Sequence, residues 1–196
     1  MKGEKRERIV RILLDTPDGS ITAYRIHKKA ECSEQWTGSY IKKLENMNLI
    51  DNTKVIDIFG LFEYWLKIRP PLQIVEYHLQ KNPLTIVKNS KLSYALTTYQ
   101  ADNLIHRYLF PTRTDIYVYK SELNLWHKTL SAQGLIGAGN TRIIIADPYI
   151  IKNSITQKGY NIVSKSQLIC DLLMEGGVAV EAANLLIRKW YSEFIR

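Results

Sequence analysis

The chain has 196 residues, of which 45% are hydrophobic and 23% charged, and its formal net charge at pH 7 is +8. That hydrophobic share argues against intrinsic disorder, and no apolar run reaches the roughly 20 residues that span a bilayer. The charged start lacks an apolar stretch and a cleavage site, so we expect a cytoplasmic protein without a membrane partner.

The first predicted elements are three helices. Segment 6–14 and segment 21–30 have helical apolar spacing, and a third helix is expected at 34–47 after Ser33, whose hydroxyl can cap its first turn. Trp36, Tyr40, Ile41, Leu44 and Met47 fall on one stripe of that helix. The short connection between the second and third helices predicts a helix-turn-helix.

Polar and basic side chains occupy much of the rest of the third helix. Donors and cations suit base edges and phosphates, although a solvated helix face would use many of the same residues. We expect Lys42 and Lys43 on phosphates, and Trp36 either on DNA or in the core. The residues expected near bases are Gln35, Thr37, Ser39 and Tyr40.

A hairpin is predicted next, because segments 54–58 and 62–68 are rich in β-branched and aromatic residues and flank Phe59-Gly60-Leu61. Three helices followed by a hairpin make a winged helix. The run 40–50 resembles the recognition-helix ending of winged helix-turn-helix regulators. The predicted wing turn has no Arg or Lys, which suits packing on a second domain better than entry into the minor groove.

The domain boundary is expected at Pro70-Pro71, where two prolines end the predicted hairpin. This gives a DNA-binding domain over 1–70 and a second domain over 71–196. Alternating helices and strands predict a small mixed sheet covered by helices, so the chain is expected to be α+β. The elements expected in the second domain are helix 72–80, strand 84–87, helix 98–109, strand 115–119, helix 121–133, strand 141–146, strand 161–163, and helices 165–174 and 178–195.

Segments 94–101, 115–119 and 166–177, together with the upstream winged helix, resemble the AbiEi-type antitoxins of abortive-infection toxin–antitoxin systems. The resemblance implies a second domain like a reduced, degenerate nucleotidyltransferase fold. It also implies a winged helix that represses transcription of its own operon. A cognate toxin or a small effector would then be a further partner.

Nucleotidyl transfer needs two acids one residue apart on a strand after a Gly-Ser turn, with a third acid on a neighbouring strand, to hold magnesium. Neither Gly19-Ser20 nor Gly38-Ser39 precedes such a pair, and we interpret Asp115 and Asp147 as turn residues beside strands. Segment 134–140 is glycine-rich but follows a helix, so a helix C-cap and turn is expected instead of a dinucleotide loop.

No Cys or His spacing typical of a metal site is present. The sequence therefore predicts no catalytic residues, no metal and no cofactor. It predicts a non-enzymatic transcriptional regulator, antitoxin-like and autorepressing, that reads double-stranded DNA with helix 34–47. A homodimer is expected, because a two-fold protein reads a palindromic site. Two alternatives stay open: a nucleotide-binding or nucleotidyltransferase enzyme, and a protein–protein adaptor that uses the winged helix.

Overall fold

The computed structural model describes residues 2–195 and divides the chain into two compact units. The first unit combines Met1–Pro70 with Asn184–Arg196, and the second is Pro71–Ala183. The second unit holds a mixed sheet covered by helices, which confirms the predicted α+β class. The C-terminal segment differs from the prediction, because it belongs to the first unit instead of extending the second domain to residue 196.

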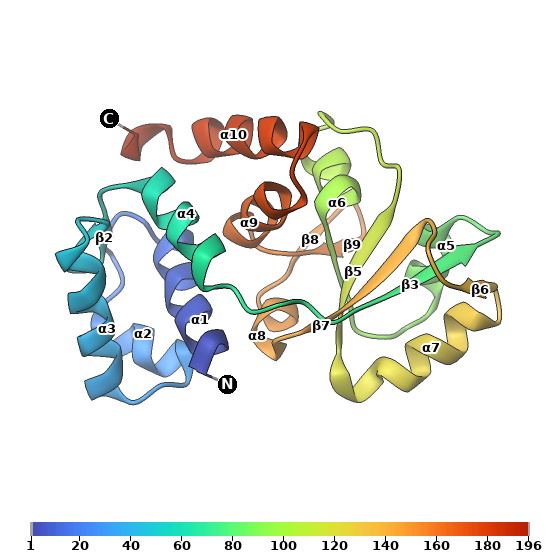
Figure 1. Ribbon diagram of the computed structural model, residues 1–196, viewed down its shortest axis with the longest axis horizontal. Helices are drawn as coiled ribbons and strands as arrows, with labels where there is room; N and C mark the ends of the chain where they lie inside the picture. Colours follow the sequence, from blue (N-terminus) through green and yellow to red (C-terminus); the bar gives the residue numbers. More distant parts are fainter. Residues whose placement is uncertain (1, 196) are drawn as a thin grey trace. The chain divides into compact units, whose positions relative to one another are not determined.

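The first unit is built mainly from helices (Figure 1). Its elements are α1 (Lys2–Asp15), α2 (Ala23–Ala30), α3 (Glu34–Asn46), β1 (Ile50–Asp51), β2 (Lys54–Val55), α4 (Ile58–Ile68), the end of α10 (Val178–Trp190) and the 3-10 turn η2 (Ser192–Phe194). The first three helices confirm the prediction. Thr22 and Ser33 cap α2 and α3, because their hydroxyls accept from the backbone N–H groups of Arg25 and Trp36.

The core of the first unit contains a buried polar contact as well as apolar side chains. Trp65 of α4 is fully buried, and its indole N–H donates to Glu7 Oε1 at 2.9 Å. The Arg11 guanidinium lies 5.1 Å from the centroid of the Trp65 ring and is 1% exposed. Arg11 therefore belongs to the interior and adds nothing to the basic surface.

The predicted hairpin around Phe59-Gly60-Leu61 is wrong, because those residues lie in helix α4. The helix begins after Asp57, whose carboxylate accepts from Gly60 N at 2.8 Å. Helical spacing buries Leu61 fully while Phe59 stays 38% exposed, so the two residues do not form a wing tip. The hairpin that does form is β1–β2, where Asn52 has a φ of 55° in the turn.

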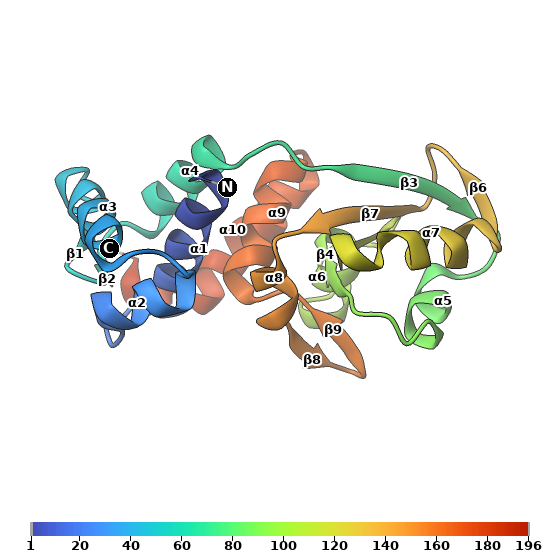
Figure 2. The same cartoon turned by 90° about the horizontal axis from the view of Figure 1, so that it is seen from below.

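The second unit holds a seven-stranded mixed sheet with the order β6-β3-β7-β5-β4-β9-β8. Figure 2 shows this sheet and its helices; α7 contacts β3 and β6, whereas α6 contacts β4, β5 and α9. Its further elements are β3 (Ile74–Leu79), α5 (Pro83–Asn89), β4 (Ala95–Thr97), α6 (Thr98–Ile105), β5 (Thr114–Tyr119), η1 (Lys120–Glu122), α7 (Leu123–Ser131), β6 (Gly134–Ile136), β7 (Thr141–Ala146), α8 (Pro148–Lys152), β8 (Ile155–Gln157), β9 (Tyr160–Ile162) and α9 (Lys165–Glu175).

Two predicted elements of the second unit have the wrong type. The expected helix 72–80 is strand β3, in which Tyr77 and Leu79 are buried at alternate positions and pair with β6 and β7. The expected strand 84–87 is helix α5, since Asn82 caps it and Pro83 occupies its first turn. The other predicted strands and helices of the second domain are present, most with shifted ends, but β4, β6, α8 and β8 were not predicted.

Segment 134–140 forms the edge strand β6 and the turn into β7, instead of the expected helix C-cap and turn. A Cβ at Gly134 would lie 2.1 Å from the backbone oxygen of His78, so close strand approach requires glycine there. The side-chain amide of Asn140 bonds both backbone groups of Leu79, at 3.0 and 2.9 Å. Across the part of the chain that the structure describes, no helix has the length and apolar character needed to cross a membrane.

Candidate nucleic-acid interface and a buried polar cluster

Helix α3 is held in the first unit by one face. Ile41 and Leu44 are buried, and the Tyr40 hydroxyl lies 3.0 Å from the Tyr64 hydroxyl of α4. Burial and this hydrogen bond raise the pKa of Tyr40 above its ordinary value, so the phenol stays neutral. The anchored face fixes which side chains of α3 reach solvent.

The predicted contact residues divide between the two faces of α3. Gln35, Ser39, Lys42 and Lys43 are exposed. Ser39 donates its hydroxyl to the backbone oxygen of Gln35 at 3.0 Å, which leaves the Ser39 oxygen able to accept. Lys43 Nζ lies 5.8 Å from the centroid of the Tyr64 ring.

Thr37 and Tyr40 are not available as base contacts, and that part of the prediction is wrong. Thr37 is 1% exposed and donates its hydroxyl to the backbone oxygen of Ser33 at 2.9 Å. Tyr40 is 5% exposed and belongs to the anchoring face. Trp36 is half-buried and stacks on the Tyr40 ring, with centroids 5.3 Å apart.

Further cations lie on the elements beside α3. Arg25, Lys28 and Lys29 of α2 are exposed, and Lys28 Nζ lies 5.6 Å from the ring of Tyr24, itself 56% exposed. Arg8, by contrast, pairs with Glu31 at 2.7 Å. Arg8 is therefore paired within the first unit, whereas the three cations of α2 face solvent.

The β1–β2 hairpin is attached to the end of α3. The Glu45 carboxylate accepts from the backbone N–H of Asn52 at 2.9 Å. Lys54 on β2 is exposed, so this hairpin carries the cation that the predicted wing turn lacked. Sequence reasoning missed it because β1 and β2 have only two residues each.

The second unit contains a buried carboxylate on its central strand β5. Asp115 is 0% exposed and accepts from Arg113 Nε at 2.6 Å, from Arg113 Nη2 at 2.9 Å and from the Thr98 hydroxyl. The interpretation of Asp115 as a turn residue is therefore wrong. Thr98 has a φ of 49°, a strained value for a β-branched residue, and its hydrogen bond to Asp115 helps to hold it there.

Salt bridges extend from Asp115 toward the surface. Arg113 Nη2 also donates to Glu175 at 2.8 Å, and Glu175 accepts from Arg142 at 3.2 Å. Arg142 in turn pairs with Glu76 at 2.9 Å. Burial alone would lower the pKa of Arg113, but the bonds to Asp115 and Glu175 offset it and raise that pKa. The guanidinium remains charged.

A second buried carboxylate, Asp171 of α9, accepts from three side chains. Tyr117 donates at 2.9 Å, Gln167 at 2.8 Å, and Thr97 donates through its hydroxyl. Asp147, by contrast, caps α8 by accepting from Tyr149 N at 3.0 Å, as its interpretation as a turn residue before a proline predicts. Among the described residues, no group of three or more His, Cys, Asp or Glu is arranged to hold a metal ion.

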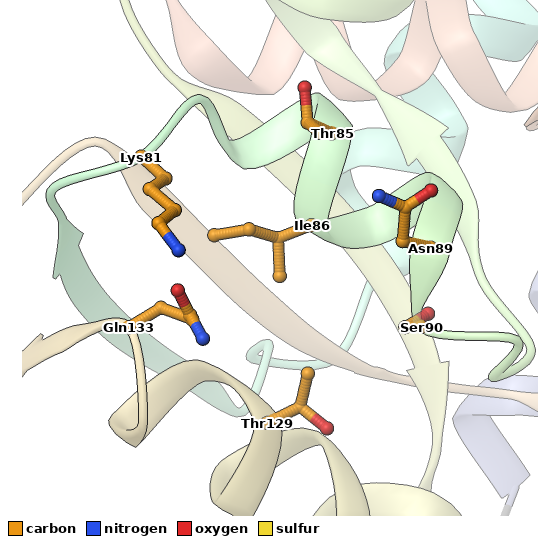
Figure 3. A pocket seen from close by; sticks show the side chains of 7 residues that line it. All are labelled: Lys81, Thr85, Ile86, Asn89, Ser90, Thr129 and Gln133. Carbon is orange, nitrogen blue, oxygen red and sulfur yellow. The ribbon is translucent and has the colours of Figure 1, made fainter.

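A pocket of about 320 Å³ lies beside α5 and α7 and contains none of the predicted contact residues. Figure 3 shows the Lys81 and Gln133 side chains near one another, with Asn89 and Ser90 farther along the α5 side. The pocket has one cation, Lys81, and more of its lining surface is apolar than polar. Comparison of the chain with protein-family models, with curated proteins and with solved structures found no match.

Proposed function

We propose that the chain is a DNA-binding transcriptional regulator whose first unit is a winged helix-turn-helix. In this proposal α2 and α3 form the helix-turn-helix, α3 enters the major groove, and the β1–β2 hairpin is the wing. One observation carries the proposal: α3 is anchored by Tyr40 and Leu44 while its polar and basic face is exposed. An exposed helix with donors and cations matches the groove's base edges and phosphates.

The roles of the exposed residues follow from their chemistry. Lys42 and Lys43 neutralise phosphates, and Lys54 supplies a further phosphate contact from the wing. Gln35 is the base-reading residue, because a Gln amide can bond an adenine edge through two atoms. The Ser39 hydroxyl accepts a hydrogen bond from, or donates one to, a base edge beside the one that Gln35 binds.

We further propose that the second unit is not a nucleotidyltransferase. Asp115 begins no Asp-x-Asp or Asp-x-Glu pair, because Tyr117 occupies the second position, and Arg142 lies opposite Asp115 on β7. Asp115 is also already bonded to Arg113 and Thr98. The second unit then serves dimerisation, a toxin partner or a small effector, as expected of a cytoplasmic, autorepressing antitoxin-like protein.

The test is binding to mixed-sequence duplex DNA across a range of salt concentrations. Affinity should fall as salt rises, and replacing both Lys42 and Lys43 by Ala should reduce the log–log salt slope by up to about 2, since each phosphate contact contributes about 0.9. The matched control is Lys67→Ala with Lys189→Ala, which makes the same change in charge at exposed positions outside α2, α3 and the hairpin.

An unchanged slope in the Lys42 and Lys43 variant, or the same decrease in the control, would place the phosphate contacts elsewhere. Absence of salt-dependent binding by the parent protein would contradict DNA binding. The adaptor function of a winged helix would then replace it.

A further inference from the structure

Gly38 is the fifth residue of the 13-residue helix α3, and the fold gives it no steric reason to be glycine. Apart from its chain neighbours and the nearby backbone of α3 itself, a Cβ built at Gly38 would have no atom within 4 Å, and the φ of Gly38 is not in the left-handed region. Gly60 and Gly134 differ, because a Cβ there would lie 2.2 and 2.1 Å from neighbouring atoms. Space inside the first unit therefore does not explain Gly38.

Glycine inside a helix has a cost for folding. It loses more backbone entropy than alanine when the helix forms, so an interior glycine destabilises an exposed helix. Gly38 is distant from both caps of α3, Ser33 and Met47, so it does not end the helix. A residue that weakens the helix without a packing or capping role points to something outside the chain that approaches it.

Gly38 lies on the polar strip of α3. Gln35, Gly38, Ser39, Lys42 and Asn46 follow one another at steps of three, one, three and four residues, which keeps them on one side of a helix. All five are exposed. The Lys42 cation and the Gln35 amide thus lie on either side of Gly38, where the backbone has no side chain. This combination suits a polyanion that also offers hydrogen-bonding base edges.

The dimensions of DNA explain how the absence of a side chain at Gly38 could help binding. The major groove is about 12 Å wide, and an α-helix with its side chains is about 10–12 Å across, so side chains limit how deeply the helix can enter. We infer that Gly38 is the point at which α3 approaches the base edges most closely, and that its missing side chain determines sequence specificity. This inference rests on the proposed function.

The experiment compares Gly38→Ala with the parent protein in thermal unfolding and in DNA binding. The probes are a duplex selected by the parent from a random-sequence library and a mixed-sequence duplex. The variant should melt at a higher temperature, bind the selected duplex about tenfold more weakly or worse, as for one lost base contact, and bind the mixed duplex within about twofold of the parent.

Asn46→Ala is the matched control, because it raises the helix propensity of α3 without adding atoms to the strip. It should also melt at a higher temperature, which measures the part of the Gly38→Ala shift that comes from helix propensity alone. If Gly38→Ala keeps the parent's discrimination, or if it melts at a lower temperature, the inference is wrong and DNA binding itself stands. If the parent binds neither duplex, the proposed function fails instead.

Discussion

Replacing Asp115 by Ala removes the acceptor at the centre of the buried polar cluster. Three hydrogen bonds are lost, two from Arg113 and one from Thr98. Arg113 retains Glu175, and its side chain is 16% exposed, so some water reaches it. Breaking a buried ion pair costs about 3–5 kcal/mol, and the residual contacts favour the lower end, about 3 kcal/mol.

Hydrogen exchange followed by mass spectrometry measures this loss where it occurs. Peptides from β5 and β7 should exchange faster in Asp115→Ala, because the opening free energy of the second unit falls. Peptides from α1 and α3 should exchange as in the parent. Glu181→Gln is the control: it removes a carboxylate that also accepts a hydrogen bond, from Tyr108, but at an exposed position, and should cost under about 1 kcal/mol. A loss below about 1 kcal/mol in Asp115→Ala would refute the expected cost of breaking this buried ion pair.

Two predictions concern Tyr191, which donates its hydroxyl to Leu14 O at 3.0 Å and packs edge-on against Phe62. Tyr191→Ala should destabilise the first unit by about 3–5 kcal/mol in thermal or urea unfolding. Hydrogen exchange that becomes faster only in peptides of the second unit would contradict this prediction. Burial, with the charge of Asp15, raises the pKa of Tyr191. The contribution of Tyr191 to the free energy of unfolding is therefore complete below the pKa of Tyr in the unfolded chain, about 10, and decreases as pH rises beyond that value. Tyr191→Phe should lose less stability between pH 9 and 11 than the parent, and equal losses would show that Tyr191 does not titrate on unfolding.

Local patterns predicted helix α3 well, because its determinants lie within the segment itself. Ser33 caps it, and apolar residues recur at helical steps. The same steps place Thr37 and Tyr40 on the buried side with Leu44, which is why neither reaches solvent. Thr37 and Tyr40 were assigned as base contacts because of their side-chain chemistry, although the helical spacing already placed them on the buried face.

Short aromatic and β-branched segments were harder to predict. Segment 58–68 has strand-like composition, but the Asp57 cap and the burial of Leu61 and Trp65 make it a helix. Segment 74–79 becomes a strand through pairing with β6 and β7, which lie more than 50 residues later. Such pairing is a tertiary effect that composition does not contain.

The buried polar cluster could not be predicted from spacing. Asp115 meets Thr98 and Arg113 close by in the sequence, but Glu175 comes from α9, 62 residues after Arg113. A cation two residues before an acid at the start of a strand was the only local signal. It fits an exposed turn as well as an interior ion pair.

The contact between Tyr191 and Leu14 joins residues 177 positions apart, and it has a consequence for synthesis on the ribosome. Residues 1–70 of the first unit are synthesised before the second unit, but Tyr191, which completes the core of the first unit, is synthesised only after it. Closing so long a loop is slow and entropically costly. A chain interrupted before Tyr191 therefore exposes Phe62 and Leu14 to chaperones and proteases, and the core of the first unit stays incomplete until synthesis has passed residue 191.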